Sequence, residues 1–157
     1  MLEKNKKYIF VFFFVIALII IIYNLNQIVV FKDKEFERLV RETMLYDNVT
    51  NEEKRDEPIV GIIWKKDLYN IERISIDFRE YRVKDISDLK KFKNLRFLAL
   101  GYPSAYDGDT SLYEDRHVLD KMYEIEKLKK LEWIYIYNLK VNEDIKAMFP
   151  NAEVFIN

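Results

Sequence analysis

Apolar residues along the chain follow three different patterns. Residues 8–31 form one run without a charged residue, and its first sixteen positions are apolar throughout. Between about residues 33 and 45, apolar residues recur at helical spacing among charged ones, which predicts an amphipathic helix. From residue 70 onward, apolar residues recur as L-x-x-L-x-L, a pattern typical of short strands that turn alternate side chains into a core.

The first pattern predicts a membrane-spanning helix over residues 8–31. At about 1.5 Å rise per residue, these 24 residues would span roughly 36 Å, which exceeds a hydrocarbon core of roughly 30 Å. A core helix of a globular protein normally has a polar face, which this run lacks. A cleaved signal peptide fits less well, because no small-x-small cleavage site follows the run. We therefore expect an uncleaved, single-pass anchor.

The orientation of this anchor is inferred from segment length rather than from charge. Lysines precede the run within residues 1–7, and Lys32, Lys34, Arg38 and Arg41 follow it closely, so the positive-inside rule does not decide. The preceding tail is short, whereas the part after the run extends to the last residue of the sequence. We expect the basic tail inside the cell membrane and the carboxyl-terminal domain on its extracytoplasmic side.

The third pattern is repeated along the chain. Its copies start at Ile71, Leu95 and Leu131, at offsets of 24 and 36 residues, and a shorter copy stands at residues 151–156. The matched core positions are Ile71, Ile74 and Ile76; Leu95, Leu98 and Leu100; Leu131, Ile134 and Ile136; and Val154 and Ile156. Apolar residues spaced by three precede the second and third copies, at Ile86, Leu89 and Phe92 and at Met122, Ile125 and Leu128. This spacing predicts short helical or 3₁₀ returns, and such a strand–turn–return unit is typical of a leucine-rich repeat.

These segments resemble bacterial leucine-rich-repeat proteins of the internalin type. "FERLVRETML" is similar to the family's capping helix, "VKDISDLKKFKNLRFLAL" to its repeat body, and "MFPNAEVFIN" to a terminal unit. The asparagine that usually follows each strand in the family is absent from "DFREYRV" and "GYPSAY". The resemblance implies an α/β fold, a short solenoid of about four parallel strands with helical or 3₁₀ returns, preceded by a helical cap. It also implies recognition of a protein partner.

The patterns divide the chain into four parts. Residues 1–7 form a basic tail, residues 8–31 the transmembrane helix, residues 32–69 the helical cap and lead-in, and residues 70–157 the repeats, with an insertion at about residues 101–121. The part beyond the transmembrane helix is long enough for one domain with its own core, and too short for two.

The insertion is expected to combine a loop with a helix. Gly101 and Gly108 indicate the loop. Ser111 with Glu114 matches a capping box, which predicts a helix that runs to about Lys129. Extra length in a repeat often carries binding, so the insertion is a candidate contact segment.

The strand residues that do not enter the core include five aromatic ones. These are Phe97, Trp133, Tyr135, Tyr137 and Phe155. Aromatic rings gathered on a surface tend to mark interaction sites. The alternative is that other segments or a second subunit cover these rings, because strands of parallel sheets are often buried on both faces. Together with Tyr102 and Tyr106 of the insertion, the five form the predicted partner-binding set.

Composition argues against catalysis, cofactors and nucleic acid. The formal net charge is −1 without a basic stripe, the chain has no cysteine for disulfides or zinc, and it contains neither a phosphate loop nor a G-x-S-x-G motif. Asp107, Asp109 and Ser111 alternate as in a calcium loop, but Leu112 and Val118 stand where glycine and glutamate are required. We expect a protein that is not an enzyme and holds no metal or cofactor.

Two other functions stay open at this point. The second interpretation is that the same rings serve homodimerisation, or docking as an accessory membrane subunit without an external ligand. A glycan-binding or cell-wall-processing protein is a third interpretation, because rings also stack on sugars. Paired carboxylates such as Asp85 and Asp88 are the groups that glycoside hydrolysis uses.

Overall fold

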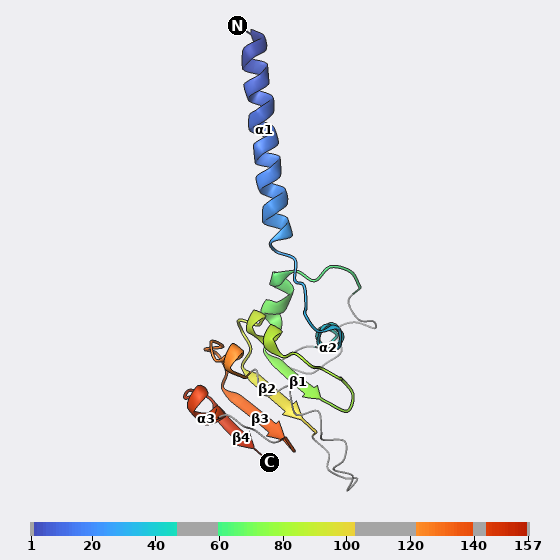
Figure 1. Cartoon of the computed structure of the whole chain (residues 1–157), viewed down its shortest axis with the longest axis vertical. Helices are drawn as coiled ribbons and strands as arrows, with labels where there is room; N and C mark the ends of the chain where they lie inside the picture. Colours follow the sequence, from blue (N-terminus) through green and yellow to red (C-terminus); the bar gives the residue numbers. More distant parts are fainter. Residues whose placement is uncertain (1, 47–59, 103–121, 140–143, 157) are drawn as a thin grey trace.

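Four short parallel strands form the centre of the protein, in the order β1-β2-β3-β4 (Figure 1). The computed structural model describes residues 2–46, 60–102, 122–139 and 144–156. The strands are β1 (Arg73–Asp77), β2 (Phe97–Gly101), β3 (Trp133–Tyr137) and β4 (Glu153–Ile156). Ahead of them stand, respectively, η1 (Lys65–Asn70), η2 (Ser87–Lys91), a 3₁₀ turn at residues 122–125, and α3 (Ile145–Met148). Two helices, α1 (Leu2–Leu25) and α2 (Lys34–Thr43), precede all of these.

The strand register confirms that the repeated positions are equivalent. The first inward row is Ile74, Leu98, Ile134 and Val154, and the second is Ile76, Leu100, Ile136 and Ile156. In the first three strands these side chains are at most 1% exposed, so neighbouring strands share one continuous core. The predicted α/β class and the predicted four-stranded parallel sheet are therefore confirmed.

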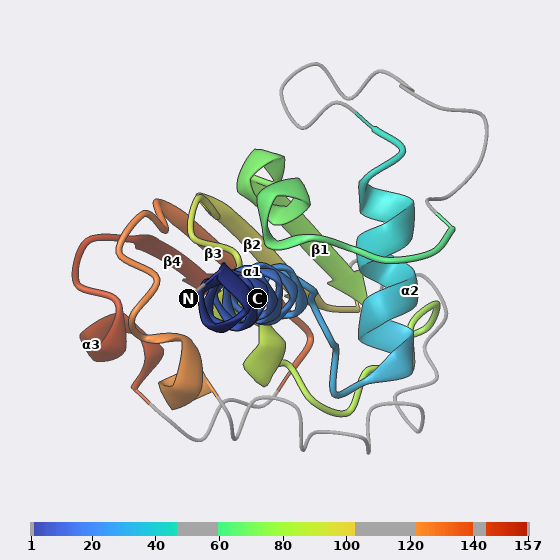
Figure 2. The same ribbon diagram turned by 90° about the horizontal axis from the view of Figure 1, so that it is seen from above.

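The last strand departs from the prediction. Ile156 is 48% exposed and Val154 is only partly buried, whereas Ile136 beside them on β3 is fully buried. β1 and β4 are both edge strands, but α2 lies on the β1 side of the sheet, whereas no described helix or strand lies beyond β4 (Figures 1 and 2). The expectation that Ile156 fills the core as its counterparts do is therefore wrong.

The returns bury the apolar residues that were spaced by three. Ile86, Leu89 and Phe92 around η2 are fully buried, and Met122 and Ile125 in the 3₁₀ turn are as well. Most of the helix predicted over residues 111–129 lies outside the described residues. In the described part, a 3₁₀ turn covers residues 122–125 and non-helical turns follow. The prediction that a helix continues to about Lys129 is therefore wrong.

Helix α2 buries the apolar side predicted for it. Phe36 is fully buried, and its ring lies edge-on to the rings of Phe31 and Phe92, with centroids 5.9 and 6.0 Å away. Leu39 and Val40 are buried beside it. Such edge-to-face pairs add about 0.5–1.5 kcal/mol each to the burial of the rings.

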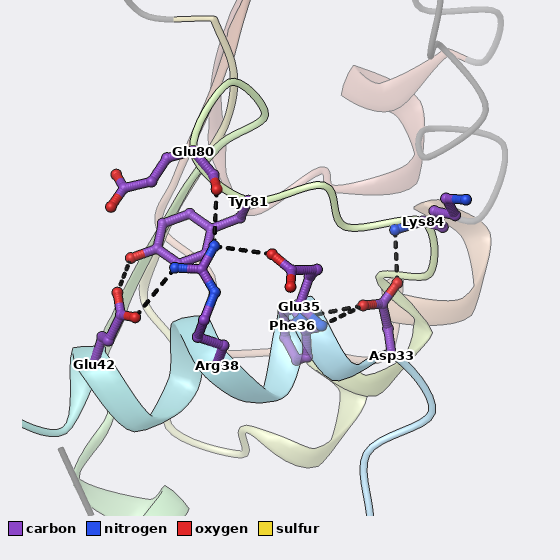
Figure 3. Close-up of polar contacts among 8 residues, drawn as sticks. All are labelled: Asp33, Glu35, Phe36, Arg38, Glu42, Glu80, Tyr81 and Lys84. Atoms are coloured by element: carbon purple, nitrogen blue, oxygen red, sulfur yellow. Dashed lines mark hydrogen bonds and ion pairs between the residues drawn. The ribbon is translucent and has the colours of Figure 1, made fainter.

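The polar side of α2 contacts the segment after β1 (Figure 3). Arg38 donates to the carbonyl of Glu80 at 2.8 Å and pairs with Glu35 at 2.8 Å. Its guanidinium carbon lies 4.4 Å from the centroid of the Tyr81 ring, and the Tyr81 hydroxyl donates to the carboxylate of Glu42. α2 is thus attached to the β1 side of the sheet by rings on one face and by charged groups on the other.

Helix α1 projects away from the sheet, with α2 to one side and α3 on the opposite side (Figures 1 and 2). Its side chains from Tyr8 to Leu25 are exposed, and this stretch is long and apolar enough to cross a membrane. The chain after α1 is held by the segment before β1. The Val29 N–H donates to the Ile63 carbonyl, and the Lys65 N–H donates to the carbonyl of residue 27, both at 2.8 Å.

Candidate recognition surface

Alternate strand residues point away from the core and form three rows on the outer face of the sheet. The first row is Arg73, Phe97, Trp133 and Glu153; the second is Ser75, Ala99, Tyr135 and Phe155; the third is Asp77, Gly101 and Tyr137. Small side chains occupy β1 and β2 in the second row, and rings occupy β3 and β4. The structure therefore brings together the five aromatic residues that the strand pattern predicted, which we call the aromatic face.

Tyr135 is the centre of the aromatic face. Its ring stacks on that of Phe155, with centroids 4.6 Å apart and planes 12° apart. The Phe97 and Tyr137 rings lie 5.3 and 5.9 Å from it. These four rings restrict one another's rotamers, and side chains that are already ordered lose less entropy in a contact with another molecule.

The aromatic face is partly open to solvent. Trp133 is 37% exposed and Phe155 is 40% exposed, while the other three rings are partly buried. Within the part of the chain that the structure describes, none of the five rings is fully covered. Large apolar side chains of this exposure on a rigid sheet are suited to contact with another molecule.

Two guanidinium groups border the aromatic face. That of Arg73 lies 4.8 Å from the centroid of Phe97, and that of Arg96 lies 6.0 Å from the centroid of Trp133. Arg96 also donates two hydrogen bonds of 2.7 Å to the carboxylate of Glu132. These bonds, aided by the positive charge of Arg96, lower the pKa of Glu132, so both groups are charged at neutral pH.

Tyr102 does not belong to the exposed surface that the sequence predicted. It is 3% exposed, and its ring packs 5.8 Å from that of Phe78. Its backbone continues the ladder from β2, with the N–H donating to the Tyr137 carbonyl at 3.0 Å. Tyr102 therefore packs in the core, where it is not exposed for contact with a partner. Tyr106 lies outside the described residues.

Two residues that position the aromatic face were not singled out from the sequence for this role. Asn138 adopts a φ of 53° and donates from Nδ2 to the Tyr102 carbonyl at 2.7 Å, which ties the residue after β3 to the residue after β2. Gly101 has a φ of +128°, and a Cβ on it would lie 2.0 Å from the Tyr137 carbonyl oxygen. An asparagine directly after a strand was the available signal for Asn138.

The carboxylates that suggested catalysis have structural partners. Asp88 is 1% exposed, accepts the Lys32 N–H at 2.5 Å, and pairs with the Lys91 ammonium at 2.8 Å. Asp85 accepts the Ser87 N–H at 2.8 Å. Within the described part of the chain, no group of three acidic or histidine side chains is placed to hold a metal ion, and the alternating residues 107–111 lie outside that part.

The arrangement is chemically suited to contact with apolar or flat groups, and it has cations at its border. Stacked rings supply dispersion and desolvation, and the Arg73 guanidinium adds a charge that can pair with an acidic side chain. No protein-family model matches this chain, and no curated protein matches it significantly.

Proposed function

We propose that this protein is a membrane-anchored recognition module of the leucine-rich-repeat type that binds a protein partner through its aromatic face. The observation that carries the proposal is the partly exposed stack of Tyr135 with Phe155 and Phe97 on a parallel sheet. Protein interfaces are enriched in aromatic residues and arginine, and rigid rings provide most of their energy. Trp133 and Phe155 are the expected anchors because they are the most exposed of the five.

Three features support the repeat architecture. The sequence copies pair in register, each of the first three strands follows a 3₁₀ return, and Asn138 links the residue after β3 to the residue after β2. In this architecture α2 acts as the cap at the β1 end, where it covers Phe92 with Phe36. The proposal includes no catalytic step, metal or cofactor.

Photocrosslinking in native membranes tests the partner. A benzoylphenylalanine probe at Trp133 is expected to capture one protein, and the same probe at Tyr123, an exposed residue of the 3₁₀ turn, is the matched control. Capture at both positions, or at neither, contradicts the aromatic face as the site. Capture of glycan alone would overturn the class of partner.

Homodimerisation is the alternative that a specific observation favours. β4 is an edge strand whose outward Phe155 and inward Ile156 are 40% and 48% exposed, so a second copy can pair with it. A crosslinked product of twice the chain mass at Trp133 would indicate this alternative. A crosslinked product that contains a different protein supports the recognition module proposed above.

The membrane topology of the proposal is tested with cysteine labelling. Since the chain has no native cysteine, Lys146→Cys on α3 gives a single exposed thiol. We expect a membrane-impermeant maleimide to label it in intact cells. Labelling only after permeabilisation would place the domain on the inner side, and release of the chain by alkaline carbonate would argue against anchoring by α1.

A further inference from the structure

A hollow of about 550 Å³ lies beside the chain that leaves α1. Residues 28–30, which follow α1, line one side, and Lys65, Tyr69, Lys90, Lys91 and Lys93 line the rest. No acidic residue is among these lining residues. Four lysines at one opening form a concentrated positive charge in a chain whose formal net charge is −1.

The hollow lies on the side of the domain from which α1 leaves. Lys65 begins η1 and Lys91 ends η2, and both elements precede strands whose arrows point away from α1 (Figure 1). The 2.8 Å bonds that join residues 27 and 29 to Lys65 and Ile63 fix this arrangement. Lys65 is therefore bonded to residue 27, two residues after α1 ends at Leu25, and the other three lysines line the same hollow.

The lysines of the hollow differ in what they contact. Lys91 pairs at 2.8 Å with the buried carboxylate of η2 and so serves the fold. Lys65, Lys90 and Lys93 are exposed. Within the described residues, only Lys90 of these three forms an ion pair, with Glu124 at 3.1 Å. Lys65 and Lys93 therefore have no acidic partner among the described residues, and the ammonium group of Lys90 is exposed beside one.

Aromatic side chains accompany the lysines at this level. Tyr69 lines the hollow and is 50% exposed. Trp64 directly precedes η1 and forms an isolated antiparallel β-bridge with Ile28. Tryptophan and tyrosine are enriched where membrane proteins meet the lipid headgroups. Lysine clusters next to a membrane helix attract anionic lipid surfaces.

We propose that the lysine-lined hollow binds the anionic headgroups of the leaflet from which α1 emerges, and so docks the domain on the membrane. This inference rests on the anchoring by α1 proposed above, and it adds the surface that orients the domain. The ammonium groups of Lys65, Lys90 and Lys93 contact lipid phosphates, while residues 28–30 continue from the apolar helix into the headgroup layer.

Amine acetylation of the full chain in nanodiscs tests the docking. One set of discs contains phosphatidylcholine only, and the other contains about one third phosphatidylglycerol. At low salt, we expect Lys90 and Lys93 to be acetylated at least about threefold more slowly in the anionic discs, because each basic group near such a surface is attracted to it. Lys146, on α3, is the internal control. The difference should vanish in about 1 M salt, where the Debye length is about 3 Å.

Paired variants locate the effect. Lys65→Gln with Lys93→Gln is expected to reduce the protection of Lys90, while Arg82→Gln with Lys129→Gln, at two exposed positions outside the hollow, removes the same charge and should leave that protection unchanged. Equal acetylation in both discs, or equal slowing of Lys90 and Lys146, would overturn the docking and leave the anchoring intact. A chain that does not enter the discs at all would overturn the anchoring and the docking together.

Discussion

The Asp33 carboxylate accepts a hydrogen bond of 2.7 Å from the backbone N–H of Lys84, which lies 51 residues further along the chain (Figure 3). Its other oxygen accepts the N–H groups of Glu35 and Phe36, at 2.8 and 3.1 Å, and so caps α2. One side chain therefore begins α2 and ties it to the segment that leads into η2.

Replacing Asp33 is expected to destabilise the domain strongly. Asp33→Ala removes a helix cap and leaves backbone N–H groups without a partner, so we expect it to lower the free energy of unfolding by about 2–3 kcal/mol. Asp144 caps the four-residue α3 through one bond of 3.2 Å, and Asp144→Ala should cost less than about 1 kcal/mol. Urea unfolding of the full chain in detergent measures both, and equal losses would contradict the dual role of Asp33.

Gly101 is expected to tolerate no side chain. Its φ of +128° is unfavourable for other residues, and a Cβ would collide with the Tyr137 carbonyl oxygen. Gly61 also has a positive φ, +97°, but has nothing within 4 Å of a Cβ. Gly61→Ala is therefore expected to cost about 1–2 kcal/mol from backbone strain alone, and Gly101→Ala distinctly more. Thermal melts compare the two, and a similar cost would contradict the close approach of β2 and β3.

The strands could be predicted because their inward residues repeat at fixed spacing. Ile74, Leu98 and Ile134 occupy the same place in three copies, and burial of one face explains the alternation. The exposure of Ile156 could not be predicted in this way, since it depends on what packs beyond each edge of the sheet and not on the local pattern. Tyr102 was misplaced because a ring after a glycine is typical of a loop, whereas the ladder to Tyr137 turns it into the core.

The candidate site was predictable only in part, for a related reason. A period of two places Trp133, Tyr135 and Tyr137 on one face, but the central position of Tyr135 depends on strand register across the sheet. The lysine-lined hollow combines residues 28–30 with residues 65–69 and 90–93, which are far apart in the sequence. No local sequence pattern predicts that these three segments lie together.

Lys91 is expected to matter for stability, unlike its neighbour Lys93. Its ammonium compensates the carboxylate of Asp88, which is 1% exposed. Lys91→Met removes the ammonium and leaves the Lys32 N–H as the hydrogen-bond donor to that carboxylate, so we expect the free energy of unfolding to fall by about 1–3 kcal/mol. Lys93→Met, at an exposed position, should change stability by less than about 0.5 kcal/mol. Denaturant midpoints of the two variants provide the comparison. If Lys91→Met leaves the stability unchanged, water replaces the ammonium beside Asp88.

Tyr81 is expected to make stability depend on alkaline pH. Burial raises its pKa well above the ordinary range, and the hydrogen bond to Glu42 and its negative charge raise it further. The unfolded chain therefore ionises first, so this stabilisation is fully present below about pH 10 and is lost as pH rises above it.

The stability difference between the native chain and Tyr81→Phe should accordingly shrink above about pH 10. Unfolding midpoints across pH measure it, and tyrosinate absorbance reports ionisation directly. Tyr123→Phe, at a tyrosine that is 55% exposed, controls for the loss of one hydroxyl. If the native chain shows more tyrosinate absorbance near pH 10 than Tyr81→Phe does, the Tyr81 hydroxyl ionises at its ordinary pKa and is not held as described.

The aromatic face contains both structural and contact residues, and alanine substitution should separate them. Tyr135 touches three other rings, so Tyr135→Ala is expected to lower the free energy of unfolding by about 2–4 kcal/mol. Trp133 is 37% exposed with a guanidinium 6.0 Å from its ring, and Trp133→Ala should cost less than about 1 kcal/mol. Partner capture through a probe at Phe155 should nevertheless fall at least about tenfold in Trp133→Ala, as for an interface anchor. A stable Trp133→Ala chain that captures its partner normally would show that the rings serve the sheet and not recognition.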